Sequence, residues 1–492
     1  MEFQVPSLNL LIALPVIIVA GTGLLLMVID LFVPDDKKAW APWLTIVGLA
    51  LALVQTAGMW GFSGGTFTPE GGYPMLVVDN FATFLNVTFV LTGILTVLLS
   101  VNYLRETGLD RPEFYMLLMI SISGMMLMGM ANDLILVFLA LEVLSIPLYI
   151  LSGFAWPNPA SEESAMKYFF LGAFSSSILV FGIALIYGAT GSTALPAVLA
   201  GIGQGGAVGL AGVALILVGF GFKVAAVPFH MWTPDVYEGA PTAVTAFMSV
   251  GAKVGGFAAM LRVFVAALPD ISDTWVGAVA VISALTLILG NIVAIAQANI
   301  KRLLAYSSIA HAGYILIAVA AGAGSDDGVS SALFYMFAYL FTNLGAFAVV
   351  IAVERQDGKG VLLDDYKGLA RHSPWLALAM AYFMLSLTGV PPTGGFSGKF
   401  YVFRAAIEAD LVWLALIGVI TSVISGYYYL RVVFLMYMYD SEGELIVSRQ
   451  PALMAAVAVT VIATVVLGIA PGAWFDITRE AALLGSQLLA GG

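Results

Sequence analysis

The sequence predicts an all-α, polytopic membrane protein. Of its 492 residues, 61% are hydrophobic and only 10% are charged, and the mean hydropathy is +1.00. An ordinary soluble protein carries about 25% charged residues, so this chain has too few polar side chains to cover a surface in water. Apolar segments of about 20 residues, long enough to cross a bilayer, recur along the whole chain. The alternating ten-residue segments of a membrane β-barrel do not occur.

These segments predict fourteen transmembrane helices. Their approximate limits are 9–33, 40–61, 77–104, 113–131, 133–155, 164–188, 209–231, 240–267, 274–295, 302–322, 329–353, 374–407, 411–437 and 452–471. The first segment is too long for the core of a signal peptide and no basic segment precedes it, so we interpret it as a span. Glycine, with 52 residues, suits the close approach of helices in lipid.

The basic residues set the expected orientation. Connections after odd-numbered helices, with their flanking residues, hold twelve of the nineteen Lys and Arg side chains, whereas the opposite side holds Arg404 and Arg479. The positive-inside rule therefore places both termini on the outer, periplasmic side. The longest polar connection, 354–373, has about twenty residues, which is too short for a catalytic domain.

The composition also excludes several classes of function. The net charge is −11 and no basic patch is present, which excludes a nucleic-acid-binding chain. Without cysteine, the chain cannot form disulfides, thiolate zinc sites, iron–sulfur clusters or a cysteine nucleophile. The segment GIGQGG at 201–206 superficially resembles a dinucleotide fingerprint, but no strand precedes it, and no phosphate-binding loop is found. The three histidines are scattered, so we expect no metal and no cofactor in this chain.

Four charged residues lie deep inside predicted spans. They are Glu142 in the fifth, Lys223 in the seventh, Lys253 in the eighth and Lys399 in the twelfth. A charged side chain at the centre of a helix costs about 2.5–3.5 kcal/mol to insert, so each of them calls for a reason. A lysine here could be a structural ion-pair partner, and Glu142 with Lys223 could be such a pair. Four charges at similar depth nevertheless favour a shared function.

His311, in the tenth span, could be a hydrogen-bonded packing residue or a proton carrier. An imidazole titrates near neutral pH, and Ser307, Ser308 and Tyr314 could hold water beside it. We therefore expect His311 to act as a relay. Polar residues near the ends of spans have simpler explanations: Arg262 should snorkel to the membrane surface.

Two spans contain helix breakers. In the seventh, Pro228 follows Lys223 by five residues, and in the twelfth the segment PPTGG at 391–395 precedes Lys399. Proline removes a backbone donor, and within a membrane the freed groups are tolerated only against protein or a wet cavity. Lys223 should thus lie at the carbonyl end of a half-helix, which favours its charge. Lys399 should lie in the first turns of another half-helix, where the positive end of the helix dipole disfavours its charge.

The two breaks are five helices apart, and an odd offset inverts the second unit in the membrane. Helices four to eight and nine to thirteen are therefore expected to form an inverted repeat, the architecture of ion-coupled transporters. We divide the chain into three N-terminal helices (1–112), a first repeat (113–267), a second repeat (274–437) and a C-terminal helix with its tail (438–492).

Four long segments resemble the antiporter-like membrane subunits of respiratory complex I. They are ESAMKYFFLGAFSSS (163–177), FKVAAVPFHMWTPDVYEGAPTAVTAFMS (222–249), KRLLAYSSIAHAGY (301–314) and LTGVPPTGGFSGKFYVF (387–403). The resemblance covers most of helices five to thirteen, whereas the first three helices carry little motif information. It implies fourteen helices, an inverted repeat and a polar axis along which protons move.

The resemblance also assigns roles by motif. Glu142 resembles the carboxylate that the family carries on its fifth helix, and Lys223 resembles the lysine partner on the broken seventh helix. Lys253 and His311 resemble central relay positions, and Lys399 resembles the terminal lysine on the broken twelfth helix. The residues before Lys253 depart from the family pattern, because we expect a proline nearby, and this leaves the local bend open.

Further expectations about partners and location follow from the same resemblance. NADH, FMN, iron–sulfur clusters and quinone should be bound by partner subunits of an NADH:quinone oxidoreductase, with no redox centre in this chain. The other membrane subunits of complex I should be its partners, and the bacterial inner membrane its location. The expected function is proton translocation driven by redox chemistry elsewhere in the complex. A cation/proton antiporter subunit and a structural subunit with an inert polar axis remain as alternatives.

Overall fold

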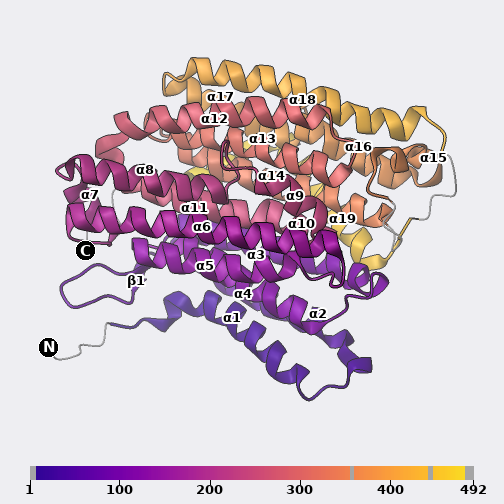
Figure 1. Ribbon diagram of the computed structural model, residues 1–492, viewed down its shortest axis with the longest axis horizontal. Coiled ribbons are helices and arrows are strands. Elements are labelled where there is room, and N and C mark those ends of the chain that lie inside the picture. Colours follow the sequence, from indigo (N-terminus) through magenta and orange to yellow (C-terminus); the bar gives the residue numbers. More distant parts are fainter. Residues whose placement is uncertain (1–6, 355–359, 442–446, 483–492) are drawn as a thin grey trace.

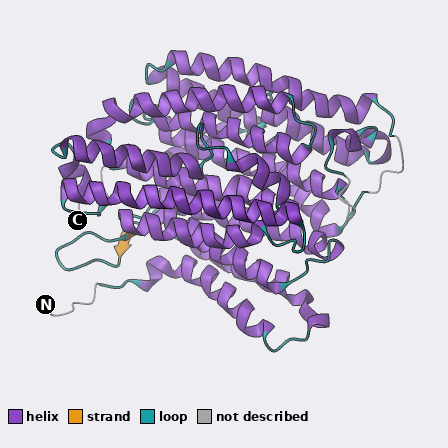
Figure 2. Cartoon of the chain, in the orientation of Figure 1, coloured by secondary structure: helices purple, strands orange, loops and turns teal. Residues whose placement is uncertain are grey.

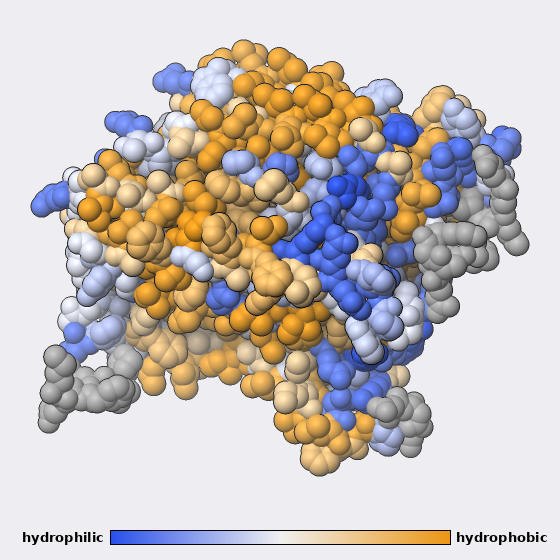
Figure 3. All heavy atoms as spheres, in the orientation of Figure 1, coloured by the Kyte–Doolittle hydropathy of each residue, from blue (hydrophilic) through white to orange (hydrophobic). Residues whose placement is uncertain are grey.

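The computed structural model describes residues 7–354, 360–441 and 447–482 of the chain. Figure 1 shows a bundle of long helices running side by side, with the N-terminal helices α1 and α2 along one margin. Figure 2 shows that helices make up almost all of the described chain. The lateral surface in Figure 3 is mainly apolar, and hydrophilic residues gather toward the ends of the helices. This distribution fits a protein whose sides face lipid.

Within the described residues, thirteen helices are long and apolar enough to cross a membrane. The single helices among them are α1 (Leu10–Asp30), α2 (Ala41–Ala57), α3 (Asn80–Glu106), α4 (Pro112–Met130), α5 (Leu134–Ser152), α6 (Pro159–Thr190), α8 (Gly206–Lys223), α12 (Ser272–Ile295), α13 (Ile300–Ala321), α14 (Gly328–Val353), α18 (Val412–Met438) and α19 (Pro451–Ile469). Of these, α8 ends at the break in the predicted seventh span. The predicted eighth span is one run made of α10 (Thr242–Phe247), η2 (Met248–Ala252), α11 (Lys253–Met260) and η3 (Leu261–Ala266). The predicted twelfth span is the pair α16 (Pro374–Thr388) and α17 (Gly394–Glu408).

Short elements connect the spans. They are η1 (Asp35–Trp40), β1 (Gly64–Thr66), β2 (Leu76–Val78), α7 (Leu195–Ile202), α9 (Trp232–Gly239), η4 (Pro269–Ile271), η5 (Leu363–Tyr366), α15 (Leu369–His372) and α20 (Pro471–Ala481). The strands β1 and β2 form one antiparallel hairpin, in which Gly65 faces Val77. The all-α, polytopic fold class is confirmed, and thirteen spans together with the α16–α17 pair account for the fourteen predicted crossings.

The break in the seventh span lies where the sequence predicts it. Helix α8 ends at Lys223 and α9 begins at Trp232, so Lys223 stands at a carbonyl end, as expected. In the turn between them, Ala225 has a positive φ of 61°. The freed N–H of Val227 donates to the Thr286 hydroxyl on α12 at 2.9 Å. The broken backbone is thus satisfied by a neighbouring helix, which is the condition for such a break within a membrane.

The break in the twelfth span is stabilised by side chains around it. Helix α16 ends at Thr388, and Gly389 follows with a φ of +90°, a conformation that favours glycine. Helix α17 begins at Gly394, and the N–H of Gly395 donates to the Ser386 hydroxyl at 3.1 Å. A Cβ atom on Gly395 would lie 1.9 Å from the Ser386 carbonyl oxygen, so no side chain fits there. The glycines therefore allow the two half-helices to meet closely.

A π-helical turn replaces the proline expected before Lys253. The turn η2 spans Met248–Ala252 and passes directly into α11, whose first residue is Lys253. A π turn adds a residue to a helical turn and redirects the side chains that follow it, and such turns occur frequently at functional sites. A π-helical turn thus stands where the sequence left the local conformation open.

Arg262 does not snorkel to the surface, so that prediction was wrong. Its side chain is buried in η3, and its Nη2 donates to both carboxylate oxygens of Asp79, at 2.9 and 3.0 Å. Its Nε donates to the carbonyl oxygen of Gly129 at 2.8 Å. Asp79 also accepts from the N–H of Ala82 and so caps α3. The position of Arg262 near a span end did not reveal that Asp79, far away in the sequence, would be its buried partner.

Candidate functional site

Four of the five predicted site residues are buried in the middle of the bundle. Lys223, Lys253, His311 and Lys399 are each 3% exposed and come from four different helices, α8, α11, α13 and α17. Glu142 lies on α5 and is partly exposed at the side of the molecule. The groups around each residue decide what it can do chemically.

Lys223 is held at the end of α8 by two hydroxyls. Its Nζ donates to the Ser145 Oγ on α5 at 2.8 Å and to the Tyr168 hydroxyl on α6 at 3.3 Å. Its Nζ also lies 5.6 Å from the centroid of the Tyr168 ring, within the range of a cation–π interaction. Tyr168 in turn stacks on Trp232 of α9, with ring centroids 4.5 Å apart. The break in the seventh span thus supplies the aromatic wall against which this lysine packs.

Glu142 and Lys223 do not form a direct ion pair within 4.0 Å, although both residues are described in the structure. Glu142 instead accepts a hydrogen bond of 2.5 Å from Ser176 on α6. A cavity of about 10 Å³, lined by Ser145, Ser176, Lys223 and their neighbours, lies between the two sites. Such a volume holds about one water molecule. The expected pair is therefore replaced by two serine hydroxyls and a water-sized space.

Lys253 binds the middle of α13. Its Nζ donates to the carbonyl oxygen and to the hydroxyl of Ser308, each at 2.6 Å. One helical turn farther along, Gly256 faces Lys223: a Cβ atom there would lie 3.3 Å from Lys223 Cγ and 2.9 Å from Val224 Cγ1. The hydrocarbon stem of Lys223 therefore rests on the backbone of the helix that carries Lys253, which brings the first two lysines onto neighbouring surfaces.

Both ring nitrogens of His311 contact tyrosine hydroxyls. Nδ1 lies 2.6 Å from the hydroxyl of Tyr335 on α14, and Nε2 lies 3.1 Å from the hydroxyl of Tyr429 on α18. Tyr429 also shares a hydrogen bond with Ser307, which adjoins the Lys253 partner Ser308 on α13. One nitrogen of a neutral imidazole donates and the other accepts, so this arrangement suits a group that can pass a proton from one side to the other.

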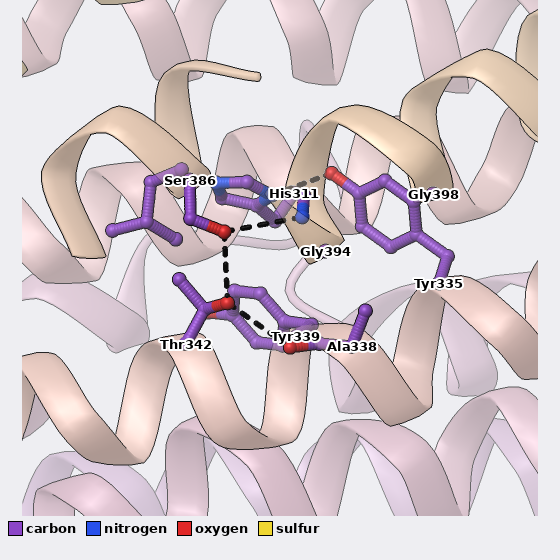
Figure 4. Close-up of a pocket in the computed structure, with 10 residues that line it drawn as sticks. His311, Tyr335, Ala338, Tyr339, Thr342, Ser386, Gly394 and Gly398 are labelled. Carbon is purple, nitrogen blue, oxygen red and sulfur yellow. Dashed lines mark hydrogen bonds between the residues drawn. The ribbon is translucent and has the colours of Figure 1, made fainter. Parts of the chain in front are cut away.

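A second cavity connects His311 with the break in the twelfth span. Figure 4 shows His311 and Tyr335 at one side of it, and Ser386 and Thr342 at another. It has about 10 Å³ of space for water, and the Thr342 and Ser386 hydroxyls lie 3.0 Å apart along it. Because Gly395 also donates to Ser386, this cavity, whose walls are mainly apolar, reaches the turn between α16 and α17.

Lys399 is bound by the carbonyl end of the other half-helix. Its Nζ donates to the carbonyl oxygens of Leu387 and Thr388, each at 2.9 Å, and to the Ser422 hydroxyl at 2.8 Å. Its Nζ also lies 4.5 Å from the centroid of the Tyr314 ring. Lys399 is in the second turn of α17, as predicted, but its ammonium reaches the negative end of the α16 dipole. The prediction of an unfavourable helix dipole was therefore wrong.

Sequence reasoning missed Tyr335 and Tyr429. Tyr335 lies in a predicted span without charged residues, and the one charged residue in the predicted span around Tyr429 is Arg431, near its end. One available signal was the clustering of tyrosines in YYY at 427–429 and at positions 335 and 339. A buried tyrosine usually finds a partner for its hydroxyl, so tyrosines within a span are candidates for polar contacts.

Charged clusters lie at the two ends of the bundle. At one end, Asp235 of α9 accepts from Lys167 at 2.7 Å and from Arg302 at 2.8 Å, and Arg302 also donates to Glu238 at 2.8 Å. At the other end, the cluster consists of Asp327, Arg404, Glu408 and Arg479, around an open cavity of about 400 Å³. The hydrogen bonds from Arg479 hold the pKa of Asp327 below its ordinary value.

No group of three or more His, Cys, Asp or Glu side chains within the described residues is arranged to hold a metal ion. The polar groups around Lys223, Lys253, His311 and Lys399 are mainly hydroxyls, ammonium groups and one imidazole, joined by hydrogen bonds or bordering water-sized cavities. Hydrogen-bonded groups of this kind, in an otherwise apolar bundle, can transfer protons.

Comparison with known proteins identifies the family. Residues 131–425 match the family model described as NADH:quinone oxidoreductase/Mrp antiporter, TM. The chain is 46% identical over 486 residues to NADH-quinone oxidoreductase subunit N of Chloroflexus aggregans, covering 97% of this chain and 98% of that one. It is also similar to a chain of respiratory complex I from Thermus thermophilus, with 35% identity, a TM-score of 0.80, and 94% and 98% of the two chains covered.

A chain of the Mrp complex from Dietzia sp. DQ12-45-1b has a TM-score of 0.85 at 22% identity, with 96% and 97% of the two chains covered. At this identity the match shows a shared fold only. The curated relative and the family model each match well over half of the sequence. The chain therefore belongs to the NADH:quinone oxidoreductase/Mrp antiporter family of membrane subunits and, within it, groups with NADH-quinone oxidoreductase subunit N.

Proposed function

We propose that this chain translocates protons as a membrane subunit of a bacterial NADH:quinone oxidoreductase. The observation that carries the proposal is a pair of buried hydrogen-bonded groups, one at Lys253 and one at His311, that meet at two neighbouring serines of α13. Lys253 binds Ser308, the adjacent Ser307 binds Tyr429, and Tyr429 binds His311. A purely structural ion pair would not require these additional groups, because a single opposite charge is enough to stabilise a buried lysine.

Redox chemistry in other subunits drives the proposed cycle. Lys223 holds a proton while Glu142 is ionised, and weakening their interaction releases that proton toward Lys253. The proton then passes His311 and the cavity beside it, and reaches Lys399. In this structure two serine hydroxyls and a water-sized cavity separate Glu142 from Lys223, an arrangement that suits the released state.

The energies set a requirement for this cycle. A membrane potential of 100 mV opposes each transferred charge by about 2.3 kcal/mol. A change of one pKa unit corresponds to about 1.4 kcal/mol. The two states of a lysine in the relay must therefore differ in proton affinity by roughly two pKa units or more, a range that burial can supply for a lysine.

We also propose the inverted repeat over 113–267 and 274–437, and an orientation with both termini periplasmic. A lysine at the carbonyl end of a half-helix occurs in both halves, because Lys223 ends α8 and Lys399 binds the carbonyl end of α16. Arg404 and Arg479, the two basic residues assigned to the outer side, share Asp327 as a partner and so lie at one end of the bundle.

Lys399→Ala distinguishes proton transfer from the two alternatives. In membrane vesicles that contain the assembled complex, we expect it to lower the number of protons pumped per NADH oxidised, because the outward end of the relay is lost. The matched control is Arg404→Gln, which removes a positive charge from the same helix but at the surface cluster. It should leave the ratio unchanged.

Two outcomes would favour the alternatives. An unchanged proton-to-electron ratio in Lys399→Ala, with altered assembly, would indicate a structural subunit whose polar axis is inert. Transport that depends on added Na⁺ or K⁺, in the parent complex and in the Arg404→Gln control, would indicate a cation/proton antiporter. The similarity to the Mrp complex in fold is what makes this second alternative worth measuring.

Gly256→Ala tests the contact between the first two lysines. The added methyl group would lie 2.9 Å from Val224 Cγ1 and 3.3 Å from Lys223 Cγ, so it must displace the lysine stem. We expect NADH-driven pumping to fall by about fivefold to tenfold, for a distortion of about 1–1.4 kcal/mol. Gly255→Ala is the matched control, because its methyl group would come no closer than 3.4 Å, to Leu144. Equal pumping by the two variants would show that the position of the Lys223 stem is unimportant.

A further inference from the structure

The hydroxyl of Tyr237 is buried without a protein partner. Tyr237 lies in α9, is fully buried, and its hydroxyl makes no hydrogen bond within the described residues. A buried hydroxyl left unsatisfied costs about 1–3 kcal/mol, so such groups normally bind water or have a further role. Thr233, on the same helix, has a second buried hydroxyl without a partner. The inner face of α9 therefore presents two polar groups to the interior.

Tyr237 faces the residue that binds Lys253. Its hydroxyl and that of Tyr339 on α14 both lie near the side chain of Ser308, although neither makes a well-formed hydrogen bond there. Ser308 holds the Lys253 ammonium with two hydrogen bonds of 2.6 Å. The ring of Tyr339 lies 4.9 Å from that of His311, on the side of the proposed relay. Tyr237 therefore places another hydroxyl beside the residue that binds Lys253.

A charged cluster at the inner surface lies close to Tyr237. Its neighbours on α9, Asp235 and Glu238, both accept hydrogen bonds from Arg302. Arg302 and Ser308 are six residues apart on α13, which corresponds to about 9 Å along the helix axis. Tyr237 shares a short helix with both carboxylates and its hydroxyl lies near Ser308, so its side chain connects the two positions. Carboxylates at a surface attract protons to that surface.

From this arrangement we propose that Lys253 takes up its proton from the inner face through the Tyr237 hydroxyl. The proposal rests on the proton-translocating function proposed above and adds a second route, besides transfer from Lys223, by which protons reach Lys253. A proton that arrives at the Tyr237 oxygen displaces the hydroxyl proton toward Ser308 and neutral Lys253. Lys253 gains one proton, Tyr237 ends with the proton it received, and the tyrosine never becomes an anion.

Tyr237→Phe removes this hydroxyl and keeps the ring. In vesicles that contain the assembled complex, we expect the rate of NADH-driven proton pumping to fall by about fivefold to tenfold, because one hydrogen bond of the transfer chain is lost. The remaining rate should fall more steeply than in the parent as the pH on the inner face rises, because proton uptake has become limiting. All rates are taken per assembled complex, measured on native gels.

The matched control is Tyr115→Phe. Tyr115 is also fully buried and its hydroxyl also has no partner, but it lies on α4 against Phe114. We expect this variant to retain the parental pumping rate and pH profile. Equal pumping by the two variants would overturn the proposal, and so would an equal loss in both, which would indicate a packing effect.

Lys253→Met separates the route from the function. If Lys253→Met loses pumping while Tyr237→Phe matches Tyr115→Phe, the route is wrong and the proposed function stands. If Lys253→Met pumps at the parental rate and ratio, the proposed function itself fails, and the route fails with it. A loss of pumping in Lys253→Met and in Tyr237→Phe, with Tyr115→Phe unaffected, is the result that supports the route.

Discussion

Lys223→Ala is expected to abolish or sharply reduce proton pumping coupled to NADH oxidation. The substitution removes the ammonium that binds Ser145 and Tyr168. In the proposed cycle, the proton affinity of this ammonium depends on its electrostatic interaction with Glu142. The groups that contact the Lys223 ammonium are the Ser145 and Tyr168 hydroxyls and the Tyr168 ring, and none of them can carry the positive charge of a lysine. The measurement is the number of protons translocated per NADH oxidised by vesicles that contain the assembled complex.

Two further variants serve as controls for this prediction. Lys38→Ala removes a lysine from the first inner connection, where it pairs with Asp30 at the surface, and should pump like the parent. Lys223→Met retains most of the side-chain volume and should lose pumping while the complex still assembles. Normal pumping by either Lys223 variant, at normal assembly, would refute the role proposed for this lysine.

The charged part of the site could be predicted from the sequence because the bilayer makes each buried charge conspicuous. Lys223, Lys253 and Lys399 stand out in spans that are otherwise apolar, and all three are buried in the structure. The breaks at Pro228 and at 391–395 could be predicted for a similar reason, since proline cannot continue a helix without loss of a hydrogen bond. The position of a lysine or of a helix break within a span can be predicted from the local sequence alone.

The polar contacts of the site could not be predicted in the same way. The partners of His311 are Tyr335 and Tyr429, which lie 24 and 118 residues away along the chain, and tyrosine is common in apolar spans. Local sequence gives no information on which of many tyrosines meet in space. The separation of Glu142 from Lys223 was equally hidden, because it depends on how α5, α6 and α8 pack.

The dipole argument for Lys399 shows a related limit. Its position in the second turn of α17 was predicted, and the charge was expected to meet the positive end of that helix. A lysine side chain is long enough to reach across the break, and the ammonium binds the carbonyls of Leu387 and Thr388 instead. The sequence position of a long side chain therefore locates its backbone, while the charge follows the nearest favourable dipole.

Arg262→Ala is expected to destabilise the protein by about 3–5 kcal/mol, because it leaves the buried Asp79 carboxylate without its counter-charge. Arg262 donates to both Asp79 oxygens and to the Gly129 carbonyl, so it ties the end of the eighth span to α3 and α4. The measurement is the amount and the thermal stability of assembled complex in membranes. As a control, Arg431→Ala should cost less than about 1 kcal/mol, because the hydrogen bonds of its guanidinium to the described residues are two long ones, each 3.4 Å, to carbonyl oxygens.

Asp79→Asn in the Arg262→Ala background identifies the cause of that loss. The asparagine removes the uncompensated charge but keeps a side-chain oxygen that can still accept from the Ala82 N–H and cap α3. If the buried charge is what destabilises Arg262→Ala, the double variant should recover part of the stability, although Asp79→Asn alone should destabilise the parent. If the loss instead comes from the guanidinium contacts and the space that it fills, the double variant should be no more stable than Arg262→Ala. Recovery in the double variant would show that the buried Asp79 charge is destabilising when Arg262 does not neutralise it.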